Sequence, residues 1–568
     1  MNYKNIIPLI LFTISMFYGK SQQIYPTDYF QKPLNIPLVL SGNFGELRTN
    51  HFHAGLDFKT QQKEGFEVLA AAEGYISRIK ISHWGYGKAI YITHPNGYTT
   101  VYGHLKKFNK TIEAYIKSKQ YQKESFEIQV FPKSHELLVK KGEIIAASGA
   151  TGGYVGPHLH FEIRNTKTEK PINPLLFGLK IKDTRSPQIK VLMGYPLSDD
   201  AQINKYGIPL KLNYKKMPNG VLLADKIYAS GRIGFGINTF DRQDGAWNKN
   251  GIYNLKMFVN DALVYEYEVE SFSFSESRQL NLLIDYKRFK DINQRVQRCF
   301  IVPKNTLSIY KNCINKGQIL IEEGLSYNVK LIASDFKGNK TTLQIPIIGK
   351  QQKIIVAKKD ETTQYPIIAA GFNKFIIDDV TVAFPKNTFY KDTYLDLKII
   401  DSVAHIHKST IPLNKKYTLT FDVSNFSKKE RAHLFIAKYS SKNKPYYVKT
   451  IKKEHTFYTT SKDLGTYRLL RDEKKPRIQF LSFKENQWIS SKQYLKVKIS
   501  DNFSGIKKYR GEINGKWILM EYSPKTKTLT YDFKDNKNQT STYNLKVTLI
   551  DNAGNTTVKT GVFKRKVQ

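Results

Sequence analysis

Histidines in three separated segments of the first third of the chain are spaced as a metallohydrolase would need them. Two of these, His158 and His160, are two residues apart. Because a β-strand alternates its faces, both rings would project from the same side of a strand. One ring could then hold a metal ion while the other faces a substrate beside it. The three segments are Asn50–Asp57, Tyr102–Leu105 and Gly149–Phe161.

The first segment supplies two more candidate metal ligands. His53 and Asp57 lie four residues apart with Gly55 between them, so they can converge if this stretch is extended. With His160 they would offer two imidazoles and one carboxylate and leave a fourth position open for water, as in a catalytic zinc site. Such a site lowers the pKa of bound water toward neutrality and polarises the carbonyl to be cleaved. His51 competes with His53, because it lies two residues earlier and could point the same way.

The two remaining histidines would supply what a metal ion does not. The reaction needs a general base to take the proton of the attacking water. It also needs a group that stabilises the oxyanion or protonates the leaving amine. His104 and His158 are the candidates for these two tasks.

Taken together, the spaced motifs resemble the signatures of the lysostaphin-type zinc endopeptidases, also called the LytM family. The glycine-rich stretch Ser148–Gly152 before the last motif also fits. The resemblance covers roughly the first third of the chain and implies a β-sheet groove fold and hydrolysis of peptidoglycan stem or cross-link peptides. The motifs that carry it are His53-x-x-x-Asp57, Tyr102-x-His104-Leu105 and His158-x-His160.

This resemblance also assigns roles to the residues of the motifs. The family's spacing to the carboxylate selects His53 over His51. None of the functional positions is replaced, which favours an active zinc endopeptidase. The alternative is a non-hydrolytic wall-binding protein, or an activator of another cell-wall hydrolase, that needs no metal. The implied zinc ligands, for one ion per chain, are His53, Asp57 and His160, and the implied catalytic residues are His104 and His158.

One stretch departs from the compact family pattern, between His104 and Gly142, where this chain is longer. Apolar residues at helical spacing predict a helix between Asn109 and Glu124, and a strand candidate follows at Phe126–Phe131. We expect this insertion to wall one side of the groove. The helical face is formed by Ile112, Tyr115, Ile116 and Lys119.

Short β-branched and aromatic runs between glycine turns predict that the first domain is mainly β. The clearest case is a hairpin, in which Lys88–His94 and Tyr98–Tyr102 flank the turn Pro95-Asn96-Gly97.

Beyond about residue 183 the chain shows many short strand candidates and an internal repeat, which favours tandem β-sandwiches. Tyr327–Asn339 is echoed by Tyr543–Asn555, and both end in Asp-x-x-Gly-Asn. We expect this motif to form the turn of a terminal hairpin. Asp501–Gly505 resembles the early part of such a domain. An acidic turn can bind calcium, but each copy offers few carboxylates, so a purely structural role is preferred.

The fold class expected is therefore mainly β, with a groove-forming peptidase domain followed by tandem Ig-like β-sandwich domains. A chain of 568 residues exceeds what one hydrophobic core holds, and 40% apolar content excludes a mostly disordered chain. The expected boundaries are a signal peptide over 1–21, the peptidase domain over 22–180, an Ig-like domain over 181–350, a β-rich domain over 351–475 and a second Ig-like domain over 476–568.

The first residues have the parts of an export signal. Lys4 precedes the apolar run Ile6–Phe17, and the small residues Gly19 and Ser21 suit cleavage before Gln22. The run is shorter than the roughly 20 residues that span a bilayer, so we expect no transmembrane anchor in the mature chain. The protein is then expected in the periplasm or cell envelope, or outside the cell.

Charge and cysteines add two further expectations. A formal net charge of +40 favours anionic partners, and export directs that preference to envelope polymers rather than nucleic acid. Solvated lysines are the plainer interpretation of the same charge.

Cys299 and Cys313 are close enough in sequence to form a disulfide and could equally be buried thiols.

Overall fold

The computed structural model describes residues 25–153, 156–359, 362–535 and 540–567. The expected export signal lies outside these ranges. The chain is mainly β, which confirms the predicted fold class. Among the described residues, no helix is both long and apolar enough to cross a bilayer.

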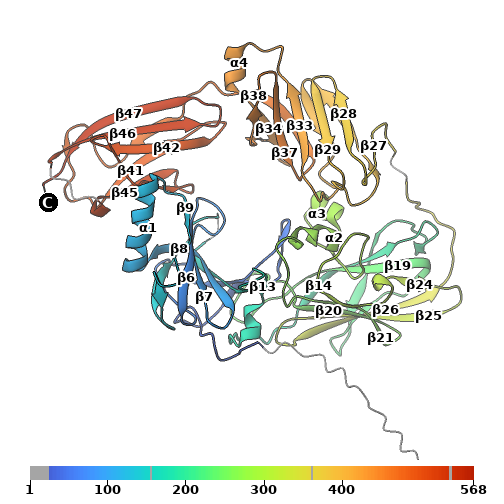
Figure 1. The fold of residues 1–568 in the computed structure, drawn as a ribbon. Helices are drawn as coiled ribbons and strands as arrows, with labels where there is room; N and C mark the ends of the chain where they lie inside the picture. The colour runs from blue at the N-terminus through green and yellow to red at the C-terminus, as the bar shows by residue number, and fades with distance from the viewer. Residues whose placement is uncertain (1–24, 154–155, 360–361, 536–539, 568) are drawn as a thin grey trace, which may run out of the picture.

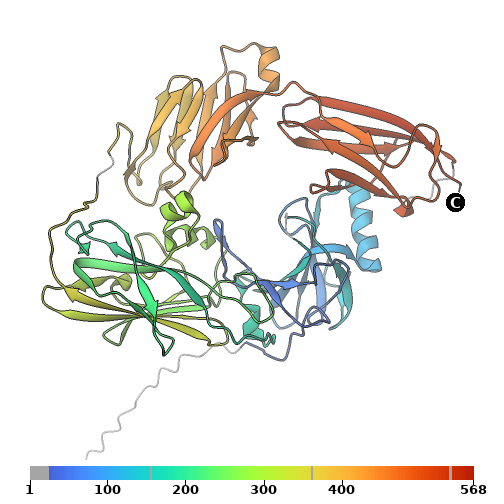
Figure 2. The same ribbon diagram turned by 180° about the vertical axis from the view of Figure 1, so that it is seen from behind.

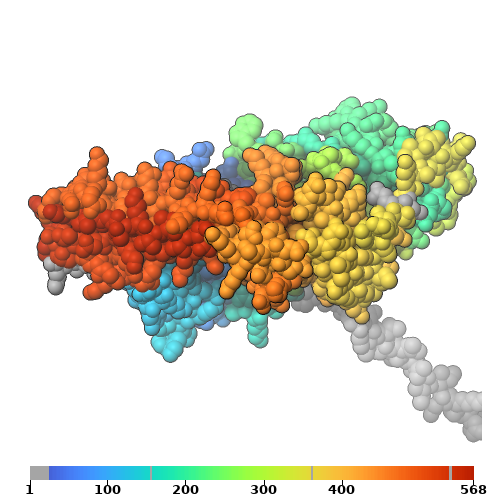
Figure 3. Space-filling view, turned by 90° about the horizontal axis from the view of Figure 1, so that it is seen from above, coloured from blue at the N-terminus to red at the C-terminus, as the bar shows by residue number. Residues whose placement is uncertain are grey.

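Four groups of sheets follow one another along the chain, and we refer to them as the first to fourth domains. They are arranged in a closed ring, in which the fourth domain returns to the first (Figure 1, Figure 2). Seen from above, the third and fourth domains form a continuous front edge of this ring (Figure 3). The domains comprise the elements within Leu40–Phe177, Gln188–Gly349, Pro366–Arg471 and Arg477–Lys564.

In the first domain an 11-stranded sheet carries the candidate site. Its main path runs β1-β4-β12-β8-β7-β6-β10, with β11 pairing to β5 and β8, β9 to β6 and β13 to β12. Buried aliphatic and aromatic side chains from these strands form the core. The strands are β1 (Leu40–Gly42), β4 (Leu56–Lys59), β5 (Glu67–Leu69), β6 (Gly74–Ile81), β7 (Lys88–Thr93), β8 (Tyr98–Phe108), β9 (Ile128–Val130), β10 (Leu138–Val139), β11 (Ile144–Ser148), β12 (His158–Asn165) and β13 (Pro171–Ile172); β2 (Leu47–Arg48) and β3 (His51–Phe52) pair separately.

Three local predictions in this domain are confirmed. Strands β7 and β8 are antiparallel neighbours across the turn Pro95-Asn96-Gly97. The helix α1 spans Lys110–Lys123, and the side chain of Asn109 accepts a hydrogen bond from the Ile112 backbone N–H at its N-terminus. The strand candidate after the helix forms β9.

The expected position of this insertion was wrong. Neither α1 nor β9 lines the pocket that contains the candidate site. Helix α1 instead lies against the fourth domain (Figure 1), where Lys117 Nζ is 2.5 Å from Asp535 Oδ1. The rings of Tyr121 and Trp517 meet edge to face with centroids 5.3 Å apart. The sequence could not show this contact, because the partner residues lie about 400 positions away.

The second domain contains a 13-stranded sheet, and many of its buried side chains belong to the same hydrophobic cluster as those of the first domain. Its long strand β19 (Ile227–Phe240) pairs with five other strands. Its main path contains β16 (Leu210–Leu212), β14 (Gln188–Pro196), β19, β26 (Lys340–Gly349), β25 (Ser326–Ser334), β20 (Asn254–Val259), β21 (Ala262–Glu268) and β23 (Tyr310–Cys313). Short helices η2 (Ser277–Gln279), α2 (Leu280–Leu283) and α3 (Tyr286–Ile292) project toward the ring's interior (Figure 1).

The third and fourth domains each contain two larger sheets that enclose a separate core, and the third also has a two-stranded sheet of β27 (Pro366–Ile367) and β30 (Thr393–Tyr394). In the third domain, one larger sheet consists, in spatial order, of β28 (Asn373–Ile377), β29 (Val380–Phe384), β33 (Tyr417–Asp422), β37 (Thr456–Ser461) and β36 (Ile451–Lys452). The other consists of β31 (Leu397–Ile400), β32 (Val403–Ile406), β38 (Gly465–Arg471), β34 (Leu434–Tyr439) and β35 (Pro445–Tyr447). In the fourth domain, one sheet consists of β39 (Arg477–Phe480), β41 (Tyr494–Ser500), β45 (Thr528–Asp532) and β44 (Glu521–Ser523). The other consists of β40 (Gln487–Trp488), β47 (Thr556–Lys564), β46 (Thr542–Asp551), β42 (Ile506–Ile513) and β43 (Lys516–Trp517).

The internal repeat forms two equivalent hairpins, as predicted. One joins β25 to β26 and the other joins β46 to β47. In each, the Asp N–H donates to the carbonyl of the Asn four residues later, which closes the turn.

The two cysteines, Cys299 and Cys313, are both free thiols, and Cys299 is buried.

Candidate active site and metal centre

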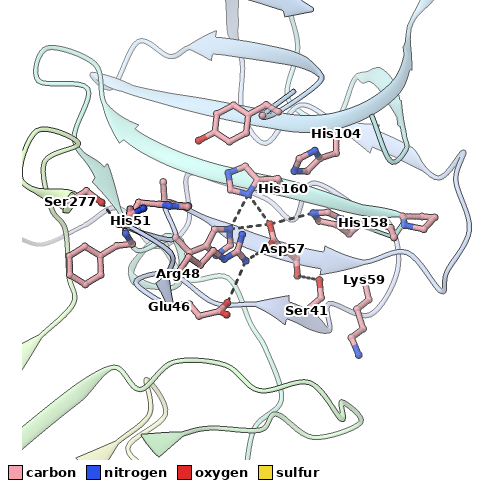
Figure 4. Close-up of a pocket in the computed structure, with 18 of the residues that line it drawn as sticks. Ser41, Glu46, Arg48, His51, Asp57, Lys59, His104, His158, His160 and Ser277 are labelled. Carbon is pink, nitrogen blue, oxygen red and sulfur yellow. Dashed lines mark hydrogen bonds and ion pairs between the residues drawn. The ribbon is translucent and has the colours of Figure 1, made fainter. Parts of the chain in front are cut away.

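Three neighbouring strands of the first domain bring the candidate residues together. Asp57 on β4 and His160 on β12 are direct cross-strand partners, so their side chains leave the same face of the sheet. On the other side of β12, His160 pairs with Gly103 of β8. A Cβ atom at Gly103 would lie 3.3 Å from the Cβ of His160, so glycine leaves room for the imidazole there. Figure 4 shows the resulting cluster.

The three candidate ligand atoms form a compact triangle. Asp57 Oδ1 lies 2.7 Å from His160 Nδ1 and 3.1 Å from His53 Nε2, and the two histidine nitrogens are 3.1 Å apart. Tetrahedral zinc with bonds of about 2.1 Å separates its ligand atoms by roughly 3.4 Å. The triangle needs only a small expansion to reach that geometry. The donor set therefore fits a zinc ion, with two imidazoles and one carboxylate.

The far nitrogen of each ligand histidine is held by an acceptor. His53 Nδ1 lies 2.8 Å from the carbonyl oxygen of Asn43, and His160 Nε2 lies 2.7 Å from Glu162 Oε1. A carbonyl only accepts, so His53 Nδ1 carries the proton and His53 Nε2 keeps its lone pair. Partners of this kind orient metal-binding histidines in general. They fix which nitrogen of each ring faces the cluster.

The two other histidines are oriented by the same device. His104 Nδ1 is 2.8 Å from the carbonyl oxygen of Thr151, and His158 Nδ1 is 2.8 Å from that of Gly156. Each Nδ1 therefore donates, and each Nε2 is left with a lone pair. The rings of His104 and His158 have centroids 4.6 Å apart, and His158 Nε2 lies 3.6 Å from Asp57 Oδ1. Two proton acceptors thus stand beside the metal-binding triangle.

His104 reaches this position through an unusual backbone conformation. Its φ is 59°, in the left-handed region that residues other than glycine seldom adopt. The pairing of β7 with β8 shifts register between Lys88 and Ile90, at the strand end where His104 lies. Such a bulge changes the direction of a side chain, which then departs from the regular alternation of faces along the strand. The His104 N–H donates to the carbonyl of Tyr86, which holds the bulge in place.

Burial and neighbouring charges shift the pKa values of the site. Burial, with the nearby His158, lowers the pKa of His104 to about 3, so its imidazole is neutral at neutral pH. Burial opposes ionisation of Asp57, but His53 and His160 hold the pKa of its carboxyl well below its usual range. Hydrogen bonds to Asp57 and Glu162 outweigh burial and raise the pKa of His160 to about 9 without a metal.

Glu162 was missed at the sequence level. Its carboxylate is fully buried and accepts hydrogen bonds from His160, from the hydroxyl of Tyr86 and, at 2.6 Å, from Arg164 Nε. The charges of Arg164 and His160 outweigh burial and lower the pKa of Glu162 to about 2. A signal was present, because His158, His160, Glu162 and Arg164 alternate along one strand and so share a face.

Arg48 also supports the cluster. Its Nη2 is 2.6 Å from Asp57 Oδ2, which leaves Asp57 Oδ1 to the histidines, and 3.4 Å from Glu46 Oε2.

His51, the competitor of His53, lies in the same pocket but is exposed, and its Nδ1 is 2.8 Å from the carbonyl of Thr49. The structure places His53, and not His51, in the triangle.

The cluster lies in a pocket of about 970 Å³ that both of the first two domains line. The second domain contributes Phe274, Ser277 and Arg278. Ser277 Oγ accepts a hydrogen bond of 2.9 Å from the Phe52 backbone N–H, next to His53. Arg278 also donates to the carbonyls of Leu413 and Lys462 in the third domain. The pocket wall is therefore connected to the rest of the ring.

A β-sheet pocket with this donor set defines a metal-dependent hydrolase domain. Residues 51–121 match the family model described as peptidase family M23. The chain therefore contains a peptidase M23 domain of the LytM type, which confirms the resemblance seen in its motifs. Residues 367–472, in the third domain, match the model of a Zu5-like domain.

Individual relatives each match about a quarter to a third of the chain. The DD-carboxypeptidase/endopeptidase Mpg of Neisseria meningitidis serogroup B is 30% identical over 168 residues, which is 29% of this chain and 32% of that protein. The peptidoglycan DD-endopeptidase ShyC of Vibrio cholerae is 27% identical over 26% of this chain and 29% of its own. This chain thus spans about a third of the length of these relatives. Among solved structures, the catalytic domain of lysostaphin from Staphylococcus simulans matches 24% of this chain and 87% of its own, with 27% identity and a TM-score of 0.18.

Proposed function

We propose that this protein is an exported zinc metalloendopeptidase that hydrolyses peptide bonds in the stem or cross-link peptides of peptidoglycan. The observation that carries the proposal is the convergence of three metal-ligand atoms with two proton-accepting histidines in one open pocket. A structural metal site would close the fourth position with another protein ligand. Here the side of the ligand triangle on which a fourth ligand would bind faces His158 and the pocket (Figure 4).

The metal would be held by His53 Nε2, Asp57 Oδ1 and His160 Nδ1. Zinc bound there supplies Lewis-acid chemistry, which polarises a peptide carbonyl toward attack. Arg48 keeps Asp57 in place through its other oxygen, and Glu162 keeps the ring of His160 in place through Nε2. These two residues position the ligands.

Proton transfer falls to His104 and His158. Their Nδ1 atoms are committed to backbone carbonyls, so only Nε2 can take up a proton. One Nε2 accepts a proton from the attacking water as the C–O bond forms. The same Nε2 then donates that proton to the leaving amine as the C–N bond breaks, so that the ring returns to its neutral form.

The names of the relatives support this substrate class. Two proteins similar to part of this chain are named as peptidoglycan DD-endopeptidases and others as a DD-carboxypeptidase/endopeptidase. A peptidoglycan substrate places the protein in the envelope or periplasm, in accord with the export signal expected over residues 1–21. The net charge of +40 suits binding to the anionic polymers of that compartment.

The test uses the full chain after removal of the export signal. Purified protein should contain one zinc ion per chain, and it should release new amino termini from defined muropeptides, read by mass spectrometry. Chelation should abolish cleavage, and zinc should restore it.

The rival function, a wall-binding or activator protein, makes a different prediction. Zinc-loaded protein would then bind isolated walls and release no new amino termini at any concentration. That result would refute the peptidase assignment even if the metal were present.

A further inference from the structure

The second and fourth domains share an acidic signature that extends beyond the repeated hairpin turn. Each has an Asp four residues before a Pro at the entry to the domain, an Asp four residues before a Gly in the middle, and the Asp-x-x-Gly-Asn turn at the end. The three parts are Asp183–Pro187, Asp241–Gly245 and Asp335–Asn339 in the second domain, and Asp472–Pro476, Asp501–Gly505 and Asp551–Asn555 in the fourth.

Folding brings the three carboxylates of each domain together. In the second domain Asp183, Asp241 and Asp335 each offer an oxygen within 4.8 Å of the others. In the fourth domain Asp472, Asp501 and Asp551 do the same. We call these clusters the first and second acidic triads.

The two triads are built in the same way. Asn339 Nδ2 donates to the carbonyl of Asp183 at 3.2 Å and to Asp335 Oδ2 at 2.7 Å. In the fourth domain, Asn555 Nδ2 donates to the carbonyl of Asp472 and to Asp551 Oδ2, both at 2.8 Å. The turn Asn therefore ties the entry segment to the hairpin in both domains. The pairs Asp183 with Asp472 and Asp335 with Asp551 are structural equivalents.

A buried oxygen of each triad also favours a bound cation. Asp241 is only 4% exposed, and its Oδ1 has no hydrogen-bond partner among the described residues. The equivalent atom, Asp501 Oδ1, is also buried and without a partner there. A buried carboxylate oxygen normally has a donor or a cation beside it, because leaving it desolvated and unpaired is costly. In both domains, therefore, the equivalent carboxylate oxygen has no hydrogen-bond partner among the described residues.

The closeness of the three carboxylates supports this interpretation. Ionised carboxylates whose oxygens lie within 4.8 Å of one another repel each other. A cation among these oxygens would remove the repulsion between them.

We propose that each acidic triad binds one calcium ion. The candidate ligands are oxygens only, with three carboxylates and no nitrogen or sulfur, which suits a hard divalent cation. Calcium accepts six to eight oxygen ligands in flexible geometry, so backbone carbonyls and water can complete the sphere, whereas magnesium requires a tighter octahedron. The inference is independent of the proposed peptidase activity.

The positions of the triads indicate what the ions do. Asp183 lies where the chain passes from the first domain to the second, and Asp472 lies where it passes from the third to the fourth. Near the first triad, Gln243 accepts from the Leu40 N–H of the first domain and donates to the carbonyl of Lys182. Each ion would thus tie a domain to the segment that enters it and fix one junction of the ring.

Near the second triad, the ring of Phe503 packs against Phe435 of the third domain with centroids 5.3 Å apart. The Ser504 N–H also donates to Asp472 Oδ2 at 2.9 Å. The loop that follows Asp501 therefore contacts both the entry segment and the preceding domain. An ion at the second triad would hold the junction between the third and fourth domains.

Equilibrium dialysis of the zinc-saturated full chain against radioactive calcium tests the proposal. We expect two calcium ions per chain. Asp241→Asn and Asp501→Asn should each reduce this to one, and the double variant to none. Asp261→Asn removes an exposed carboxylate of the second domain and should leave both ions bound. No calcium on the unaltered chain, or the same calcium on the double variant, would overturn the proposal.

Thermal unfolding separates loss of the ion from failure to fold. Calcium should raise the unfolding temperature of the unaltered chain but not that of the double variant. In calcium-free buffer the double variant should be at least as stable as the unaltered chain, because the amides relieve repulsion within each triad. A calcium-dependent rise that survives in the double variant would place the ions elsewhere. Magnesium that displaces calcium from both triads at equal concentration would overturn the choice of calcium.

Discussion

The first domain and the two Asp-rich domains each bring together three candidate metal-ligand residues from separate segments of the chain, but the ligand types differ. The site in the first domain combines two imidazoles with a carboxylate and faces an open pocket. The acidic triads contain oxygens only and lie at domain junctions. Mixed nitrogen and oxygen ligands suit zinc, whereas oxygen alone suits calcium. The donor type and its exposure, more than the number of ligands, distinguish a catalytic centre from a structural one.

The largest effect is expected from loss of a zinc ligand. His160→Ala should abolish stoichiometric zinc and reduce peptidase activity by about a thousandfold or more, because the Lewis acid is lost with its ligand. Calcium content should stay at two. His51→Ala, in the same pocket, should leave zinc and activity unchanged, and equal loss in both variants would contradict the assignment of His53 and His160. Metal analysis and muropeptide cleavage provide the measurements.

Next comes loss of a proton acceptor. His104→Ala should retain zinc but lower kcat by roughly a hundredfold to ten-thousandfold, the range for general acid–base catalysis. His158→Ala should behave in the same way. Loss of zinc from either variant would show that these rings bind metal, and the division between ligands and acceptors would have to be redrawn.

A smaller effect is expected from the residue behind the metal ligand. Glu162→Gln should weaken zinc binding or activity by about tenfold to a hundredfold, because the amide no longer provides a charged acceptor for His160. The matched control is Glu169→Gln, because Glu169 is an exposed carboxylate that also pairs with Arg164. This variant should change neither zinc binding nor activity. Competition with a zinc chelator measures the affinity. Similar affinities for both variants would argue that Glu162 serves stability alone.

A histidine outside both kinds of site should determine part of the acid sensitivity. His94 is buried, and burial lowers its pKa to about 4. The unfolded chain takes up a proton below about pH 6.5, but the folded domain does not until about pH 4. Stability should therefore fall as the pH drops through this window, by at most on the order of 3 kcal/mol.

Hydrogen exchange of the amides in β7 and β8 measures this loss. His94→Gln should reduce it, because the substituted side chain does not titrate. His135→Gln, on an exposed histidine of the same domain, should not. If both variants lose stability like the unaltered chain, His94 is not the titrating group.

The smallest effect concerns the contact that closes the ring. Trp517→Ala removes the ring that packs on Tyr121 of α1 and should weaken the contact by about 1 kcal/mol. Open chains should become more populated, which small-angle scattering detects as a larger radius of gyration. Zinc and calcium content should not change. Trp488→Ala removes an exposed tryptophan of the same domain and should leave the scattering curve unaltered.

Local features of the fold were predictable where they depend on neighbours in sequence. The hairpin around Pro95-Asn96-Gly97 and the helix capped by Asn109 follow from turn and capping chemistry. The position of α1 was not predictable, because it depends on Trp517 and Asp535 in another domain. The candidate site was likewise predicted only in part from the sequence. Its His and Asp residues were found from spacing, whereas Glu162 and Arg48 were identified only from their contacts.

What the sequence by itself determined is the chemistry available in each segment. The alternation of His158 and His160 and the spacing of His53 to Asp57 specify imidazoles and a carboxylate, because residue type and local periodicity suffice for that. Only the tertiary structure decided which segments share a metal. One Asp in a turn is a poor calcium ligand, and the repeat alone suggested no more than a turn. Three such residues, brought within 4.8 Å by chain segments up to 152 positions apart (335 − 183), make a binding site possible.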